Sequence, residues 1–206
     1  MSTARFERIK QFARGNEGNY SNIAGDTGGE TYRGISRVWN PTWQGWVIID
    51  AYKRSVNRPL RNNELIKNNA LEVLISDFYF ANFYSVLKCE SYKNESVATT
   101  VYDYALGVDP NDATKLVQKI LNANFGKKLP VDGLFGNQTL TALNIVDAKA
   151  FFDIYNEARK QHYINRANTV ANQAQFLPSW LSRLNKLKFS TSTAAVSITA
   201  VFFWLV

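Results

Sequence analysis

The chain has 206 residues, of which 46% are hydrophobic and 20% are charged, and its formal net charge is +7. This composition excludes global disorder, and the length allows one good core or two small modules that share an interface. The basic balance favours an anionic partner such as nucleic acid, anionic lipid or a bacterial wall polymer, but charge alone cannot choose among them.

The N-terminal residues are predicted to form one amphipathic helix. Residues 3–14 place Phe6 and Ile9 at helical spacing, and Gly15 follows as a suitable helix end. Charged residues interrupt this stretch throughout, so we expect no N-terminal signal peptide. The glycine-rich residues 16–34 favour a loop or a short hairpin. Residues 39–46 hold three tryptophans around a proline and favour an irregular aromatic loop.

The rest of the chain is dominated by helical periodicity. Asp109 is a plausible N-cap with Pro110 in the first turn behind it, and residues 129–139 are rich in turn formers. Helices are predicted over residues 63–84, 96–106, 111–124, a short stretch through Leu140 and Leu143, 147–170 and a last one opened by Pro178. The fold class is therefore mainly α, with at most a small β element in the glycine-rich loop.

The chain lacks the residues that several kinds of functional site require. Cys89 is the only cysteine and His162 the only histidine, so neither an internal disulfide nor a His-rich zinc site is expected. There is no phosphate-binding glycine motif and no G-x-S-x-G for a serine hydrolase. We expect no metal and no cofactor, and a surface or structural role for His162.

One carboxylate stands just past the predicted end of the first helix. Glu17 is followed by a glycine and lies near Tyr20, so it can be partly shielded from water. Desolvation raises the pKa of a carboxyl group, and a raised pKa is what a general acid needs near neutral pH. An ordinary solvated loop glutamate has the same local sequence, so Glu17 alone decides nothing.

The following residues suit a sugar-binding loop. Gly28 and Gly29 permit tight turns and the close approach of a ligand to the backbone. We expect Tyr20 and Tyr32 to stack on sugar faces and Thr31 to hydrogen-bond a hydroxyl group. The alternative is a purely structural turn in which the glycines serve only to allow positive φ.

Taken together, these residues resemble a known signature. F-x-R-G-N-E-G-N-Y followed by D-T-G-G-E-T-Y-R-G-I is similar to the N-terminal pattern of glycoside hydrolase family 108, E-G-G-Y and then D-x-G-G-x-T-x-x-G-I. Asn19 departs from it by replacing the second glycine. Members of this family are lysozyme-like N-acetylmuramidases of phages and bacteria, and some are secretion activators. The resemblance implies a lysozyme-like helical fold and cleavage of the β-1,4 bond between N-acetylmuramic acid and N-acetylglucosamine.

The resemblance also implies site residues. Glu17 would protonate the leaving oxygen through a transition state with oxocarbenium character. Asp26, on the adjoining loop, is the best candidate for a second catalytic group, either as a base or as an electrostatic stabiliser. Asp103 is a weaker candidate, because a helix-borne aspartate more often has a structural role.

The second half carries another recognisable pattern. Residues 131–139 resemble the D-G-x-F-G-x-x-T signature of peptidoglycan-binding helical modules, with Asp132, Gly133, Phe135, Gly136 and Thr139 at the matching positions. Turn chemistry at Asp132-Gly133 explains this pattern as well as a direct sugar contact does. The expected organisation is a catalytic domain over residues 3–107, a helical peptidoglycan-binding domain over 108–188 packed on it, and an apolar tail over 189–206.

The expected partner is bacterial peptidoglycan, with action at the cell wall as a phage endolysin or a wall-remodelling enzyme. Residues 191–206 are uncharged and follow two lysines, so they fit either an unanchored tail or a short membrane anchor. One alternative is a non-catalytic wall-binding protein, which the departure at Asn19 permits. Another is a nucleic-acid binder, for which charge is the only support, so we expect no nucleic-acid partner.

Overall fold

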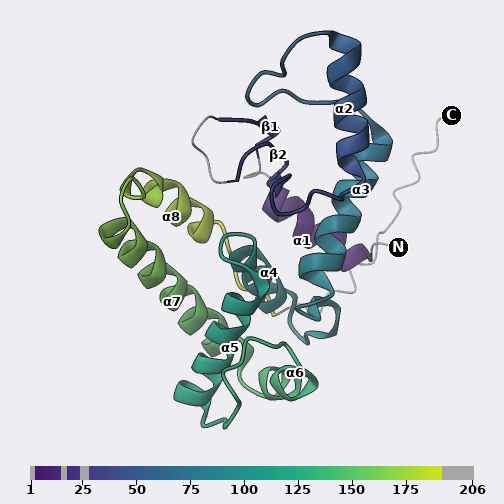
Figure 1. The fold of residues 1–206 in the computed structure, drawn as a ribbon. Helices are drawn as coiled ribbons and strands as arrows, with labels where there is room; N and C mark the ends of the chain where they lie inside the picture. The colour runs from purple at the N-terminus through teal and green to yellow at the C-terminus, as the bar shows by residue number, and fades with distance from the viewer. Residues whose placement is uncertain (1–2, 15–17, 24–27, 192–206) are drawn as a thin grey trace, which may run out of the picture.

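The computed structural model describes residues 3–14, 18–23 and 28–191 of the chain. Helices dominate these residues, and one small antiparallel sheet interrupts them, so the predicted mainly α fold is confirmed (Figure 1). The elements in order are α1 (Ala4–Arg14), β1 (Tyr20–Ser21), β2 (Thr31–Tyr32), β3 (Ile35–Ser36), α2 (Gly45–Val56), α3 (Asn69–Tyr79), the π-helical η1 (Phe80–Tyr84), the 3-10 helix η2 (Cys89–Ser91), α4 (Glu95–Ala105), α5 (Pro110–Phe125), α6 (Asn137–Asn144), α7 (Ala148–Thr169), the 3-10 helix η3 (Ala174–Phe176) and α8 (Leu177–Asn185).

Two predicted boundaries were wrong. The irregular loop expected over residues 39–46 ends early, because Gly45 and Trp46 already belong to α2, a helix that the sequence analysis missed. The helix expected from residue 63 begins only at Asn69, because the side chain of Asn68 accepts a hydrogen bond of 2.9 Å from the backbone N–H of Leu71 and caps α3 there.

The sheet is built from three very short strands in the order β1-β2-β3. Tyr20 pairs with Tyr32 and Ser21 with Thr31, while Thr31 also pairs with Ser36. A two-residue turn of Arg33 and Gly34 joins β2 to β3, with φ values of 50° and 78°. Positive φ at both central residues is the turn geometry that matches the twist of a hairpin, so Gly34 is required for conformational reasons.

The buried hydrophobic residues form two cores. The hairpin core joins the sheet to α2, α3 and the loop before α3, and it consists of Tyr20, Tyr32, Ile35, Trp46, Ile49, Ile66, Leu71 and Ile75. The helical core runs from Phe6 of α1 through α4 to Leu187 beyond α8. Because a single apolar cluster contains residues from both halves of the sequence, the second half packs directly on the first, as expected.

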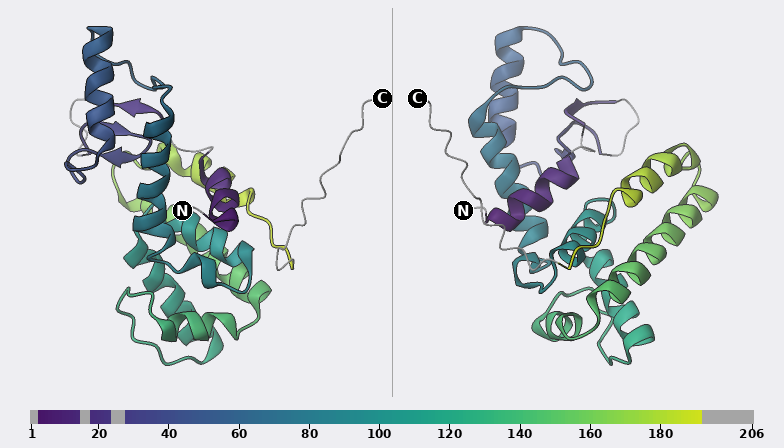
Figure 2. Two further views of the ribbon diagram at one scale, coloured as in Figure 1. Left: turned by 90° about the vertical axis from the view of Figure 1, so that its right-hand side faces the viewer. Right: turned by 180° about the vertical axis from the view of Figure 1, so that it is seen from behind.

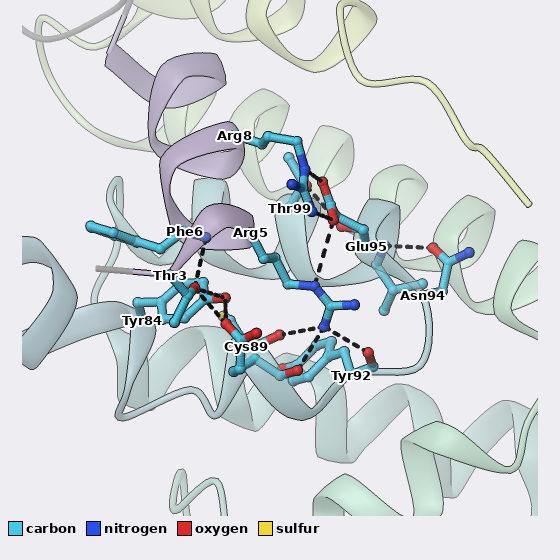
Figure 3. Close-up of polar contacts among 12 residues, drawn as sticks. Thr3, Arg5, Phe6, Arg8, Tyr84, Cys89, Tyr92, Asn94, Glu95 and Thr99 are labelled. Atoms are coloured by element: carbon cyan, nitrogen blue, oxygen red, sulfur yellow. Dashed lines mark hydrogen bonds and ion pairs between the residues drawn. The ribbon is translucent and has the colours of Figure 1, made fainter. Parts of the chain in front are cut away.

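Helix α1 is fastened to the segment that precedes α4 (Figure 3). One Nη1 atom of Arg5 donates to the carbonyl oxygens of Cys89, Glu90 and Tyr92 at 3.2, 2.7 and 2.8 Å. Arg8 makes a bidentate pair with Glu95, with N···O distances of 2.8 and 2.6 Å. These bonds fix the helix that leads to Glu17.

Two charged side chains of the second half reach Asp103 of α4. The Asp103 carboxylate is completely buried and accepts from Arg159 of α7 at 2.6 Å and from Arg183 of α8 at 2.7 Å. Figure 2 shows α7 and α8 running side by side as a helical hairpin. Asp103 therefore ties both arms of this hairpin to the first half, which is the structural role weighed for it from the sequence.

After α8 the chain returns to the start of α4. The backbone N–H of Ser190 donates to the Ser96 hydroxyl at 3.0 Å, and the Asn94 side-chain amide donates to the Ser190 carbonyl at 2.8 Å. None of the helices within the described residues is long and apolar enough to cross a membrane. The apolar residues 192–206, on which the anchor hypothesis rests, lie outside the described residues.

Candidate active site

A cleft of about 390 Å³ opens beside the small sheet. Its first lining residue is Gly18, the residue directly after Glu17. The full lining comprises Gly18, Asn19, Tyr20, Ser21, Ile23, Thr31, Gly34, Asn62 and Asn63. Glu17 and Asp26, the two predicted acid groups, lie outside the described residues.

The wall opposite β1 is made by the loop before α3. The backbone N–H of Asn63 donates to the Tyr20 carbonyl at 2.7 Å, and the Tyr20 N–H donates to the Glu64 carbonyl at 3.3 Å. The loop therefore runs alongside β1 and is joined to it by backbone hydrogen bonds, as a neighbouring strand would be. Asn63 takes the left-handed conformation with φ 64°, which asparagine tolerates better than most residues.

Asn19, the position that departs from the family pattern, is part of this wall. Its backbone N–H donates to Asn63 Oδ1 at 3.2 Å, and its side-chain amide donates to the Asn63 carbonyl at 3.1 Å. The Asn62 Oδ1 atom accepts from the Asn22 N–H at 3.3 Å. The side-chain amide at position 19 thus supplies a hydrogen bond to the Asn63 carbonyl that glycine cannot make.

Sequence reasoning missed Asn62 and Asn63. Both are exposed, and because their Oδ1 atoms accept from backbone groups, their NH₂ groups remain as donors at the cleft. The signal available in the sequence was two consecutive asparagines ahead of a capped helix. Asparagine pairs are common in turns, so this signal does not distinguish a binding residue from a turn residue.

The loop is held by Glu64 on its outer side. Arg58 donates to both carboxylate oxygens of Glu64 at 2.9 Å, and the Arg61 backbone N–H donates to it at 2.8 Å. The hydrogen bonds from Arg58 and then from the Arg61 backbone lower the pKa of Glu64 to about 2. Glu64 is therefore a fixed anion at neutral pH and cannot act as a proton donor there.

A cluster of four charged side chains lies on the face of the sheet that is turned toward α2. Arg37 makes a bidentate pair with Asp50 of α2 at 2.8 and 2.7 Å and donates to Glu30 at 2.9 Å, and Lys53 also bonds Glu30. Burial raises the pKa of Glu30, but the bonds from Lys53 and Arg37 outweigh it, so the net pKa is lowered. Glu30 is thus an ionised structural residue beneath the cleft.

The predicted sugar-binding residues differ in where they lie. Thr31 is half-buried and lines the cleft, as a sugar-contacting residue must. Tyr32 is completely buried, and its hydroxyl accepts from the Ile66 N–H at 3.0 Å. Tyr20 is only 4% exposed, with the Lys53 ammonium 5.4 Å above its ring. The predicted stacking on sugars is therefore wrong for Tyr32, and Tyr20 offers no open ring face for it.

The two predicted glycines, Gly28 and Gly29, precede β2 and are not among the residues that line the cleft. The Gly28 carbonyl accepts from the Ser36 hydroxyl at 2.6 Å. Gly29 has φ 59°, and a Cβ atom there would lie 2.9 Å from a methyl carbon of Val38. Gly29 is required both for its conformation and for the close passage of Val38.

The residues of the signature in the second half stabilise a turn. Gln118, buried in α5, donates to Asp132 Oδ1 at 2.8 Å and accepts from the Gly133 N–H at 3.0 Å. Hydrogen bonds from the Leu134 backbone and then from Gln118 lower the pKa of Asp132. Thr139 is buried, with its hydroxyl 3.4 Å from Gln118, so direct sugar contact does not fit it.

Phe135 and Gly136 also have structural roles. Phe135 is buried, and its ring stacks on Tyr92 of the first half, with centroids 5.4 Å apart and an interplanar angle of 20°. This burial fits the structural alternative for the signature, in which Phe135 fills the space between the two halves, better than a direct sugar contact. Gly136 is the N-cap residue of α6.

Comparisons with known proteins agree with this arrangement. Residues 11–108 match the family model of glycosyl hydrolase 108, and residues 112–185 match a model described as a predicted peptidoglycan domain. A search of the curated proteins gave no match. The structure of Brucella abortus SagA is similar, with 20% sequence identity and a TM-score of 0.61 over 90% of this chain and 92% of that chain, which shows a shared fold. The first half of the chain is therefore similar to glycosyl hydrolase 108 and the second half to a predicted peptidoglycan domain, a combination that supports peptidoglycan hydrolase activity.

Proposed function

We propose that the chain is an N-acetylmuramidase, which hydrolyses the β-1,4 bond between N-acetylmuramic acid and N-acetylglucosamine with Glu17 as the general acid. The observation that carries the proposal is the cleft whose wall begins at Gly18, one residue after Glu17. The other carboxylates next to the cleft, Glu30 and Glu64, have lowered pKa values and serve as ion-pair partners. Neither is suited to give up a proton near neutral pH.

The cleft supplies the groups that a glycan needs. Amide NH₂ groups of Asn62 and Asn63 and the Thr31 hydroxyl can bind sugar hydroxyl and acetamido groups. Glu17 protonates the leaving glycosidic oxygen, and positive charge develops on the sugar ring in the transition state. Water then completes the hydrolysis, so the bond between the two sugars is replaced by one hydroxyl group on each product.

For the second catalytic group we propose Asp26, as a base or an electrostatic stabiliser. A carboxyl separation of roughly 6.5–9.5 Å from Glu17 would accommodate a water for inversion, whereas about 5 Å would suit retention. The anomeric configuration of the released sugar, followed by NMR during the reaction, distinguishes these two outcomes.

The test of the general acid is Glu17→Gln, which keeps the shape of the side chain and removes its proton. Loss of general acid catalysis lowers the rate of wall lysis by at least about 10²-fold. Glu157→Gln is the control, because Glu157 is an exposed residue of α7 in the second half. Turbidity clearing of purified sacculi gives the rate, and mass analysis of the released fragments identifies the bond.

Two results would contradict the proposal in different ways. Near-normal lysis by Glu17→Gln removes Glu17 from the chemistry. Sedimentation of the wild-type protein with sacculi that it never dissolves favours the alternative of a non-catalytic wall-binding protein.

We also propose that residues 3–107 carry out catalysis and that residues 108–188 bind the wall. The enzyme acts at the cell wall, in the periplasm or outside the cell, as an endolysin or a wall-remodelling enzyme. Residues 191–206 fit either an unanchored tail or a membrane anchor, and a fractionation experiment separates the two. Removal of residues 192–206 tests the anchor, because a membrane-associated protein moves to the soluble fraction when its anchor is lost. Recovery of both forms in the soluble fraction would discard the anchor.

A further inference from the structure

An exposed tryptophan stands at the end of the small sheet. Trp39 is 74% exposed and its neighbour Val38 is 56% exposed. Tryptophan is ordinarily among the more buried residues, and large aromatic groups are enriched where proteins bind partners. Trp39 plays no part in the hairpin core, so packing does not explain its presence there.

The sheet connects Val38 to the cleft. Ser21, Thr31 and Ser36 are paired across the three strands, so their side chains lie on one face of the sheet. This is the face away from α2, since Tyr20, Tyr32 and Ile35 on the opposite face belong to the hairpin core. Beyond Ser36 the chain turns, and Val38 lies beside Gly29, where a Cβ atom would meet a methyl carbon of Val38 at 2.9 Å.

Among the described residues, Gly29 links the cleft to Val38, because it stands two residues before Thr31 of the cleft and lies against the Val38 side chain. Ile23, which lines the cleft, is 54% exposed. Gly29 has no side chain to interrupt the surface, and Val38 packs against its Cα position. Adjacent strands lie roughly 5 Å apart, so the step from β1 to β3 is about 10 Å. A polymer bound in the cleft can therefore pass over Gly29 and reach Val38 and Trp39.

The turn that carries Trp39 is fixed before any ligand binds. The Trp39 N–H donates to the Ser36 hydroxyl at 3.4 Å, and the Asn40 N–H donates to the Ser36 carbonyl at 2.9 Å. The Asn40 carbonyl in turn accepts from the Trp46 indole of α2 at 2.8 Å. A side chain presented by such a turn loses less conformational freedom on binding than one on a loose loop.

We propose that Val38 and Trp39 form an outer subsite that binds the same peptidoglycan glycan strand as the cleft, with the indole ring against the apolar C–H face of a sugar. The inference rests on the proposed function, because it takes the cleft to be the place of cleavage. The occupant is a glycan because Gly29 links the cleft to Val38 and because the substrate is a polymer that must extend beyond the bond being cut.

The test compares Trp39→Ala with Trp39→Phe, and uses Val73→Ala as the matched control. Val73 is an exposed apolar residue of α3, 58% exposed, and it does not line the cleft. The measured quantity is kcat/KM on long glycan strands divided by kcat/KM on the shortest fragment that is cleaved. We expect this ratio to fall about tenfold in Trp39→Ala through a higher KM, as for an aromatic anchor at an interface. Trp39→Phe should recover most of it, and Val73→Ala should match the wild type.

A second measurement separates failure of the subsite from failure of the proposed function. Glu17→Gln and the double variant Glu17→Gln with Trp39→Ala are sedimented with purified sacculi, so that binding is read without cleavage. Weaker binding by the double variant supports the subsite even if the wild type proves inactive. Equal binding by both proteins, or an unchanged kcat/KM ratio, overturns it. A concentration-dependent dimer that Trp39→Ala abolishes would assign Trp39 to contact with a second copy, and would overturn it too.

Discussion

Asp103 accepts from two guanidinium groups although its own carboxylate is completely buried. Replacing Asp103 with Asn leaves Arg159 buried without a counter-charge. Removing one partner of a buried ion pair typically costs about 3–5 kcal/mol, because the remaining charge is not solvated. We expect Asp103→Asn to lower the free energy of unfolding in urea by that amount.

Asp153→Asn is the control for this prediction. Asp153 pairs with Lys149 on the surface of α7, and more than half of each side chain is exposed. Exposed pairs contribute about 0–1 kcal/mol. Similar losses in the two variants would show that the buried pair makes no special contribution to the contact between the halves.

Glu30 makes stability depend on pH. Its pKa in the folded state lies below the ordinary value of 4.5, because the bonds to Lys53 and Arg37 outweigh burial. A depressed folded-state pKa gives stability that is present above 4.5 and is lost as the pH falls through the folded-state value. We expect Glu30→Gln to cost about 1.5–3 kcal/mol at neutral pH, the size of a hydrogen bond to a charged group.

The measurement is thermal unfolding from neutral pH into the window below 4.5, for the wild type, Glu30→Gln and the surface control Glu157→Gln. The wild type and the control should lose stability steeply in that window, and Glu30→Gln should lose less. Parallel curves for all three proteins would mean that Glu30 does not carry this pH dependence.

At the scale of single residues, the sequence predicted which residues form a motif better than it predicted the tertiary contacts of their side chains. The pattern around Glu17 and Thr31 indicated the resemblance to glycosyl hydrolase 108, because it depends on residue identity and spacing. It could not show that the Tyr32 hydroxyl bonds the backbone of residue 66, a contact made across the hairpin core. Asn62 and Asn63 were missed because they reach the cleft through pairing with β1, which is non-local.

The turn before α6 depends on one glycine. Gly133 has φ 79°, and a Cβ atom there would lie 3.1 Å from the Asn111 carbonyl oxygen. Gly126 has φ 63° but would meet nothing within 4 Å, so Gly126→Ala isolates the cost of the left-handed conformation. That cost is about 1–2 kcal/mol for an L-residue.

We expect Gly133→Ala to destabilise the protein more than Gly126→Ala does, because the contact with Asn111 is added to the conformational cost. Chemical unfolding gives both values. Wall binding by the second half should weaken with Gly133→Ala if the turn presents the binding surface. Equal destabilisation by the two variants would show that the backbone at Asn111 yields easily.

The start of α5 was predicted from its N-cap residue, whereas the capped start of α3 and the whole of α2 were missed. Asp109 caps α5 as expected, accepting from the Asp112 N–H at 2.8 Å. Helix α2 begins at Gly45 after a cluster of tryptophans, and its N-cap residue Gln44 makes no capping bond from its side chain. Its helical character comes from burying Trp46 and Ile49 in the hairpin core, a tertiary effect that local propensity does not report.

The boundaries of the family matches and the boundaries of the hydrophobic cores divide the chain at different places. The family matches meet between residues 108 and 112, whereas the helical core includes α1, α4 and the helices of the second half. We expect the whole chain to unfold in one transition followed alike by fluorescence and circular dichroism. A fragment of residues 1–108 should not fold, because it would expose the α4 residues that face α5 and α7.

Two separate transitions, or a folded fragment 1–108, would contradict this prediction. The predicted boundary near Pro110 rests on a change in motif and turn residues along the sequence. The sequence could not show that α4 lies between α1, α5 and α7, since helix periodicity reports one buried face and not the identity of the neighbours.

Cys89 has a consequence for where the protein can work. It is the only thiol in the chain, it is completely buried, and burial raises its pKa, so little reactive thiolate forms. The native protein therefore has the same covalent structure in a reducing cytosol and in an oxidising extracellular space. It needs neither an oxidant to mature nor protection from mixed disulfides, so the proposed action at the cell wall places no redox requirement on this chain.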